Sequence, residues 1–400
     1  MKRIISFILV CCFVISGAAV VAYADVAEAT TTESVLRLSH SEIDRLVRRG
    51  NLTIRNNEIT IQNIDSMLGN EDMIPAMLNS IDQLRALQRR SSGALAVLNP
   101  ADLDPVNQAI IQSLTNDVVS FEMNIAQITG QIEQIHNAPR AARDRTAMQL
   151  GNVNRQIIWG AESLFLGYHA LARQLEQSNE TLKTLDRNIT AMERRVALGQ
   201  ITARTVESIR NNRSQLAQGI KTMEAELGNL SSQINLLLGR AHDAPLQIGP
   251  LPAAERDFLR SVDRTRDLRS ARNSNHLINI ARIDIDEHAR QIGESSRRQE
   301  AIARNNYDSE VRAVELRYEN LTRAITERQA LLTLEETQLN HLQQTLEETR
   351  RRHGVGLVSR NDLEQAESEV ALQTIRVKSA DAELFTAIRR YDWLIRGLSV

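Results

Sequence analysis

The sequence contains very little cysteine. Its 400 residues include two cysteines, Cys11 and Cys12, and both lie in an apolar run near the N-terminus. Lys2 and Arg3 precede that run, and an Ala-Tyr-Ala site follows it, which together predict a secretory signal peptide over residues 1–24. Cleavage after the signal would leave a chain without disulfides, thiol nucleophiles or thiolate metal sites. An uncleaved run would instead act as a membrane anchor, so both interpretations predict an exported protein.

Aromatic residues and prolines are also scarce. Aromatics make up 3% of the chain, and no proline follows Pro252. This composition indicates long helices that pack through narrow seams, and it excludes a thick globular core. The formal net charge is −2, with acidic and basic residues mixed along the chain. No basic block points to a nucleic acid as a partner.

Motifs for catalysis are absent from the sequence. It contains no H-E-x-x-H, no G-x-S-x-G and no glycine loop that would cradle a phosphate. An enzyme is therefore the least favoured class, and no cofactor is expected. The densest acidic group runs from Asp284 to His288, and these two residues share one face of a predicted helix. A solvated helix face is favoured over a metal site there.

Apolar residues recur with a seven-residue repeat, spaced alternately by three and four positions. Such spacing places them on one stripe of a supercoiled helix. Some helices carry a second stripe, which favours a helix with neighbours on both sides. The clearest positions are Leu182, Leu185, Ile189, Met192 and Val196, then Leu216, Ile220, Met223, Leu227, Leu230, Ile234 and Leu237, and later Leu363, Ala366, Val370, Val377, Ala380 and Leu384; the second stripe includes Leu372, Ile375, Ala382 and Phe385.

Breaks in this repeat divide the chain into predicted elements. The segment 242–252 contains three prolines and is the clearest linker. Beyond it the chain is predicted to be helical as far as Leu398. The other expected elements are a first helix from Ser39–Glu42 to Gly69, amphipathic helices over about 76–98 and 105–136, a loop over 91–105, long helices over 140–197 and 203–239, and breaks at Gly293–Ser296 and Asn305–Asn306.

Two glycine turns match each other. The stretch "GQITARTVE" from Gly199 aligns with "GLVSRNDLE" from Gly356, about 157 residues later, and Gly354 lies just before the second turn. Thr202 and Ser359 occupy matching positions where a helix N-cap is expected. Each turn joins two long helices, and the second of these ends at a glycine. We therefore predict a duplicated all-α chain of long antiparallel hairpins, with repeats at 36–240 and 254–400 joined by a linker at 241–253.

The doubled pattern resembles the TolC-type outer-membrane efflux and secretion channel family. The stretches that carry the resemblance are "VALGQITARTVESIRNNRSQL" with "INLLLG", and "HGVGLVSRNDLEQAESEVAL" with "DWLIRG". The resemblance implies an α-barrel protomer, three of which form a hollow twelve-helix barrel closed at one end by the hairpin tips. The family also inserts two membrane strands in each repeat. No alternating stretch of that kind is evident, so little or no β-barrel is expected.

The resemblance also implies roles for residues near the turns. The aperture acid of the second hairpin falls on Asp362, and the matching position in the first hairpin is Thr205. A second family acid falls on Gln365, and the aromatic at the tip falls on His353. A ring of three Asp362 carboxylates would favour cations. The alternatives are that Asp362 only stabilises the start of its helix, and that His353 is an ordinary surface residue.

The family resemblance implies a conduit for efflux or secretion. The expected partners are two further copies of this chain, a membrane-fusion adaptor that meets the hairpin tips, and an inner-membrane pump. The tips would open like an iris around Gly199 and Gly354/Gly356. The expected location is the cell envelope, in the periplasm and outer membrane, or the cell surface where the host has no outer membrane. The alternative is a coiled-coil spacer of the envelope that does not transport.

Overall fold

The computed structural model describes residues 35–63, 74–97, 115–126, 128–129, 139–289 and 293–398, so the predicted signal peptide lies outside the described residues. Nearly all of the described chain is helical, and its strands are β1 (Leu36–Leu38) and β2 (Leu246–Ile248). The helices are η2 (His40–Glu42), α2 (Ile43–Gly50), α3 (Leu52–Asn63), α4 (Ile74–Val97), α6 (Pro139–Ala197), α7 (Ala203–Leu237), α8 (Phe258–Ser261), α9 (Arg264–Ser274), α10 (His276–Ala289), α11 (Glu294–Gly354) and α12 (Arg360–Ile395), and residues 115–126 are helical as well.

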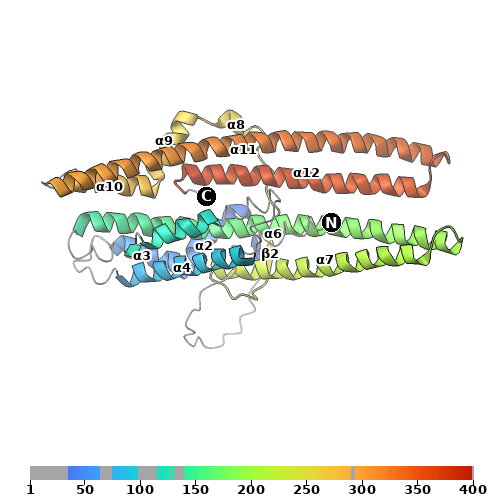
Figure 1. The fold of residues 1–400 in the computed structure, drawn as a ribbon, viewed down its shortest axis with the longest axis horizontal. Coiled ribbons are helices and arrows are strands. Elements are labelled where there is room, and N and C mark those ends of the chain that lie inside the picture. Colours follow the sequence, from blue (N-terminus) through green and yellow to red (C-terminus); the bar gives the residue numbers. More distant parts are fainter. Residues whose placement is uncertain are drawn as a thin grey trace.

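Two long helical hairpins dominate the molecule (Figure 1). One is formed by α6 and α7, the other by α11 and α12. The four helices lie side by side in the order α11, α12, α6, α7, and both hairpin tips lie at the same end, on the right of Figure 1. With 59 and 61 residues, α6 and α11 are each roughly 90 Å long at the rise of an α-helix. The prediction of an all-α chain of long antiparallel hairpins is confirmed.

The seven-residue repeat explains why these helices pair. In α7 the buried residues Ile220, Met223, Leu230 and Ile234 lie on one stripe, and they pack in a core with residues of α6. Removing such side chains from water provides about 1.5–3 kcal/mol each before the entropy of ordering is counted. The second hairpin has its own core, which includes the buried Val314, Tyr318, Ile325 and Leu332 of α11.

The double stripe predicted for α12 is present. Leu384 is fully buried and so lies among the core residues shared with α11. The second stripe is also withdrawn from water, since Ile375 and Ala382 are 3% and 2% exposed. Helix α12 has α11 on one side and α6 on the other, which accounts for both stripes. Trp393 of α12 packs edge-on against Trp159 of α6, with ring centroids 6.1 Å apart, as expected for packing residues.

Two predicted helices are interrupted at positions where the seven-residue repeat did not predict a break. The helix expected from Ser39–Glu42 to Gly69 breaks at Asn51, and residues 64–73 lie outside the described part. In the second repeat the break falls at Asn275, between α9 and α10. Each asparagine side chain accepts hydrogen bonds from backbone N–H groups two and three residues later, so each caps a new helix. The first helical segment begins at Ser39–Glu42 as expected, in a capping box in which the Glu42 carboxylate accepts hydrogen bonds from Ser39.

Other boundary predictions were wrong. Helix α11 continues without a break through Asn305–Asn306, because its apolar stripe carries on past them. Helix α4 agrees with the helix predicted over about 76–98, so the loop predicted from residue 91 is wrong over 91–97, while residues 98–114 lie outside the described part. The predicted break at Gly293 is confirmed: α11 begins directly after this residue.

The linker also contains a strand that was not predicted. Strand β2 pairs in parallel with β1, with Leu36 opposite Leu246 and Leu38 opposite Ile248. Leu38 is 1% exposed, and Gly249 N–H donates to its carbonyl at 2.8 Å. A strand of three residues is too short to produce a recognisable alternation in the sequence. Among the described helices, none is both long enough and apolar enough to cross a membrane.

Candidate functional site

The two hairpin tips have the same backbone structure. At the first, Gly199 N–H donates to Val196 O at 2.8 Å, and the next N–H donates to Arg195 O at 2.9 Å. At the second, Gly356 N–H donates to His353 O, and the next N–H reaches the carbonyl of Arg352, both at 2.9 Å. This is the Schellman arrangement, which needs a residue in the left-handed region. Gly199 and Gly356 supply it, with φ of 69° and 77°.

Gly354 lies in the helix before the second turn, although its position in the sequence suggested that it forms part of the turn itself. It is the last residue of α11 and is absent from the positive-φ glycines, so the turn itself depends on Gly356. The lone His353 is not a free surface ring. Its Nδ1 lies 2.8 Å from the carbonyl oxygen of Val358, so the ring bridges the two sides of the turn.

Asp362 forms the cap of its own helix. Its Oδ2 accepts hydrogen bonds from Ser359 Oγ at 2.7 Å and from Ser359 N–H at 3.3 Å, and Ser359 Oγ accepts from Asp362 N–H at 3.2 Å. This capping box satisfies backbone donors at the start of α12. The predicted N-cap role of Ser359 is therefore present, and the helix-stabilising interpretation of Asp362 has a concrete geometry. Both bonds accepted by Asp362 end on one carboxylate oxygen.

The first tip is capped less completely. Thr202 is the N-cap of α7, but its side chain accepts no hydrogen bond from the helix backbone. Its Oγ1 lies 3.2 Å from Oγ1 of Thr205, so the two hydroxyls bind each other. The structure thus places Thr205 and Asp362 at matching positions of two matching turns. Asp362 accepts two hydrogen bonds from Ser359, whereas the Thr205 hydroxyl binds the Thr202 hydroxyl.

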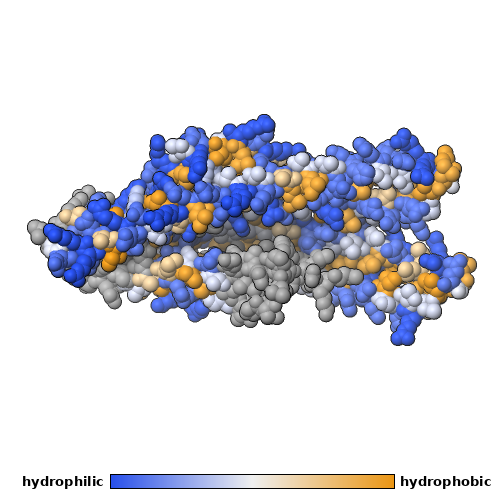
Figure 2. All heavy atoms as spheres, turned by 45° about the horizontal axis from the view of Figure 1, so that its top comes forward, coloured by the Kyte–Doolittle hydropathy of each residue, from blue (hydrophilic) through white to orange (hydrophobic). Residues whose placement is uncertain are grey.

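Apolar side chains project from both tips. Leu198 beside the first turn is 71% exposed, and Val355 and Leu357 on either side of Gly356 are 71% and 73% exposed. Figure 2 shows hydrophobic residues gathered at the end of the molecule where the hairpins turn. A monomer would leave these side chains in water, so the tips carry a small surface suited to another protein.

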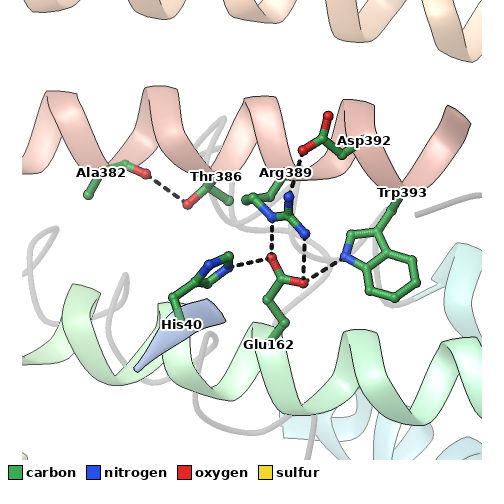
Figure 3. A network of polar contacts seen from close by, with 7 residues as sticks. All are labelled: His40, Glu162, Ala382, Thr386, Arg389, Asp392 and Trp393. Carbon is green, nitrogen blue, oxygen red and sulfur yellow. Dashed lines mark hydrogen bonds and ion pairs between the residues drawn. The ribbon is translucent and has the colours of Figure 1, made fainter. Parts of the chain in front are cut away.

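A buried carboxylate links the two repeats, and sequence reasoning missed it. The side chain of Glu162 on α6 is 5% exposed and lies against α12 (Figure 3). It binds Arg389 Nε at 2.5 Å and Trp393 Nε1 at 2.7 Å, and it lies 2.8 Å from His40 Nε2. Arg389 also donates to Asp392 at 2.6 Å. No local motif marks such a residue, because its partners come from two parts of the chain that lie far from it in sequence, His40 and α12.

The pKa of Glu162 follows from this environment. Burial raises the pKa of the carboxyl group, but the hydrogen bonds from His40, Arg389 and Trp393 and the charge of Arg389 outweigh burial and lower it to about 2. Burial opposes the charge of Arg389, but its bonds to Glu162 and the charge of Asp392 raise its pKa. The pair is therefore a fixed ionic contact between the first and second hairpins at neutral pH.

Nearer the tips, α6 and α12 are joined by a second polar contact. Arg187 Nη1 donates to the Glu364 carbonyl at 3.0 Å and to Ser368 Oγ at 2.9 Å. Lys378 pairs with Glu176 at 2.9 Å between the two levels. The hairpins are thus joined along their length by hydrogen bonds and an ion pair as well as by apolar packing.

Two carboxylates of the acidic group at 284–288 are engaged by an arginine. Asp284 and Glu287 of α10 both pair with the buried Arg145 of α6. Within the part of the chain that the structure describes, no group of three or more His, Cys, Asp or Glu residues could hold a metal ion. The prediction of a solvated helix face at 284–288 was incomplete, because this face of α10 packs against α6.

Comparison with known proteins adds evidence for the fold. The sequence matches no protein-family profile and no curated protein. Among solved structures it is similar to the outer membrane protein VceC of Vibrio cholerae, with a TM-score of 0.52 and 9% identity over 90% of this chain and 97% of VceC. It is also similar to CusC, whose crystal structures describe conformational changes that accompany folding and transmembrane channel formation. The TM-score is 0.50, and the identity is 15% over 89% of this chain and 96% of CusC. The chain has the fold of these proteins.

The TolC-like fold inferred from the doubled turns is thereby confirmed. At these low identities the likeness concerns the arrangement of helices. In this TolC-like fold, the matched turns at Gly199 and Gly356 become matched hairpin tips. The functional residues at those tips remain predictions from sequence and local geometry.

Proposed function

We propose that this protein is a TolC-type conduit for efflux or secretion across a bacterial cell envelope. The observation that supports this most is the arrangement of α11, α12, α6 and α7 in one row with both tips at one end. Within one chain, α7 and α11 lie at the edges of the row. Three copies joined edge to edge would close into a twelve-helix tube, which is the homotrimer that the resemblance implies.

The edges carry side chains suited to such contacts. Leu316 and Leu334 of α11 are 60% and 64% exposed, and Leu236 of α7 is 44% exposed. Isolated exposed leucines are common, but these lie on the two helices at the ends of the row of four long helices. Their burial against a second copy would add to the stability of the trimer.

At the closed end, the gate would be built from the second hairpin. Three Asp362 carboxylates around the axis would attract cations and repel anions. Because both cap bonds use Oδ2, the capping role leaves the other carboxylate oxygen for such a ring. Thr205 and His353 would line the same aperture. Opening would move the tips at Gly199 and Gly354/Gly356 apart, and the α6–α12 contacts near Arg187 would break or re-form.

The exposed tip residues support docking to an adaptor. Leu198, Val355 and Leu357 would meet the tip of a membrane-fusion adaptor, helix on helix, and the adaptor would connect the tube to an inner-membrane pump. This arrangement places the protein in the cell envelope, with the tips in the periplasm. The chain acts in this proposal as a passage and not as an enzyme.

Oligomeric state and conductance test the proposal together. The mature protein should form a trimer in light scattering and give ion-conducting pores in planar bilayers. Asp362→Asn should reduce the preference of those pores for cations, while Asp257→Asn, at the residue just before α8 and away from the tips, should not change it. A monomer or dimer without conductance would instead support a coiled-coil spacer. A conducting trimer with unchanged selectivity would retain the conduit and reject the Asp362 gate.

A further inference from the structure

A basic groove lies on the second repeat, away from the hairpin tips. It is formed by α9, α10 and the beginning of α11, which lie toward the left of Figure 1, and its volume is about 390 Å³. The lining residues are Arg264, Thr265, Leu268, Arg269, Arg272, Asn273, Arg282 and Tyr307. Half of these residues are arginines, although the chain as a whole has a net charge of −2.

Two of the four arginines are neutralised by nearby carboxylates. Arg264 pairs with Glu319 at 2.9 Å, and Arg272 pairs with Glu315. These contacts hold the α9 side of the groove against α11. They leave the other two guanidinium groups to set the net charge of the groove.

Arg269 and Arg282 form no salt bridge with a carboxylate among the described residues, although the charge of Arg269 acts on the nearby Asp263 carboxylate. Arg269 is exposed and enters no ion pair there. Arg282 donates to the neutral side-chain oxygen of Asn279 at 3.3 Å, and its guanidinium lies 5.6 Å from the centre of the Tyr307 ring. This cation–π contact holds the guanidinium over the Tyr307 ring while leaving its charge available.

A third observation points to a missing acceptor. The Nε atom of Arg272 is buried and has no hydrogen-bond acceptor, although the end of the same side chain is paired with Glu315. A buried N–H without a partner destabilises the fold unless something binds it. The groove therefore combines two guanidinium groups that form no salt bridge among the described residues with one unsatisfied buried donor.

We propose that this groove binds a phosphate-bearing anion of headgroup size. Guanidinium groups bind phosphate oxygens through paired, charge-assisted hydrogen bonds, which match the planar donors available here. Inorganic phosphate alone would leave most of the groove empty. A phosphoglycerol or phosphorylated sugar would also contact the apolar surfaces of Leu268 and Tyr307. The ligand is either the headgroup of an anionic lipid or a soluble phosphate ester.

Binding to defined probes tests this proposal. Wild-type protein should bind sn-glycerol 1-phosphate in calorimetry, or should bind vesicles of phosphatidylglycerol and phosphatidylcholine in flotation, but not vesicles of phosphatidylcholine alone. Binding to vesicles without binding to the soluble ester identifies a lipid headgroup. Binding to both probes with similar site affinity identifies a soluble phosphate ester.

Variants separate the groove from general electrostatic attraction. The double variant Arg269→Gln with Arg282→Gln should lower affinity at least tenfold, while Arg323→Gln, at an exposed arginine further along α11, should change it less than twofold. Both groove arginines are exposed, so the variants should keep the wild-type helical signal in circular dichroism. Absence of binding in the wild type, or an equal loss in Arg323→Gln, overturns the proposal. The test does not depend on conductance, so it is independent of the conduit proposal.

Discussion

Gly239 packs backbone to backbone against Gly50, and neither position has room for a side chain. A Cβ atom on Gly50 would lie 1.8 Å from the Leu238 carbonyl oxygen, and one on Gly239 would lie 2.1 Å from the Gly50 carbonyl oxygen. The second repeat has the same joint, where a Cβ on Gly397 would lie 2.0 Å from the Ser274 carbonyl oxygen. In each repeat, the glycine that follows the last long helix therefore packs against the residue just before a capping asparagine.

We expect alanine at either glycine of the first joint to be strongly destabilising. Gly50→Ala forces two backbones apart, and Gly239→Ala also places alanine at a φ of 69°. Each should cost about 3 kcal/mol of unfolding free energy, measured by urea denaturation. Gly151→Ala is the control, since that helical glycine has open space around it and should gain about 0.5–1 kcal/mol. Equal effects at all three positions would contradict the joint.

The Glu162 network predicts a large cost for a small change. Glu162→Gln removes the charge that compensates the partly buried Arg389, and leaves Trp393 and His40 with a weaker acceptor. Breaking a buried pair in this way costs about 3–5 kcal/mol. The matched control is Glu176→Gln, which breaks the exposed pair with Lys378 and should cost less than about 1 kcal/mol. Similar values for both variants, in denaturation followed by circular dichroism, would show that the network contributes little.

Two histidines should make the fold sensitive to mild acid. Burial, with repulsion from Arg173, lowers the pKa of His169 to about 4, and burial with Arg155 nearby lowers that of His276 to about 4. Each contributes stability that is fully present above pH 6.5 and is lost as the pH falls through 4, because the unfolded chain takes up the proton first. We expect each to account for roughly 2 kcal/mol of the loss between pH 7 and pH 4.5.

The contribution of these histidines is tested by comparing the unfolding free energies of two variants at the two pH values. His169→Gln should reduce the difference in unfolding free energy between pH 7 and pH 4.5, whatever its effect at either pH alone. His242→Gln, at a side chain that is 72% exposed, should leave that difference unchanged. The prediction is wrong if both variants retain the full wild-type difference.

The two glycines of the second tip should respond in opposite directions. Gly356 has a φ of 77°, so Gly356→Ala should cost about 1–2 kcal/mol. Gly354 is helical and has open space around it, so Gly354→Ala should be neutral or stabilising by up to about 1 kcal/mol. Thermal unfolding of the two variants measures this contrast. A loss at Gly354 as large as that at Gly356 would mean that both glycines form the turn.

The helix caps at the two tips should also differ. Ser359 binds the backbone of α12, so Ser359→Ala should cost about 1 kcal/mol. Thr202 binds only the Thr205 hydroxyl, so Thr202→Ala should cost no more than a few tenths of a kcal/mol. Unfolding free energies at pH 7 provide the comparison, and equal losses would contradict the difference in capping.

The hairpins could be predicted from the sequence because their signals are local. The helix expected over 140–197 is Pro139–Ala197, and the one expected over 203–239 is Ala203–Leu237. The seven-residue repeat defines each helix, and the glycines at 199 and 356 mark where it must turn. The likeness between these two turns also predicted the fold, because a generic coiled coil has no reason to repeat them.

The contacts between repeats could not be predicted in the same way. Glu162 lies on an amphipathic helix, and its partners at positions 40, 389 and 393 have no fixed spacing from it. The breaks at Asn51 and Asn275 did have a local signal, since asparagine is a strong N-cap residue, but the apolar repeat on either side obscured it. Asp362 shows what could be predicted at the tip: its helix-stabilising role was one of the two alternatives and is present as a capping box, while its role as a gate stays a prediction.

The pairing of β1 with β2 has a consequence for synthesis on the ribosome. The strand that closes the first repeat follows α7 directly, so the first 250 or so residues can complete their own helices and sheet before α11 and α12 are made. At that stage the carboxylate of Glu162 has no guanidinium beside it, because Arg389 is among the last residues to emerge. The nascent first half would hold an uncompensated acid on the surface that later receives α12. Docking of the second half then supplies the guanidinium partner of this acid and forms a buried ionic contact between the two halves.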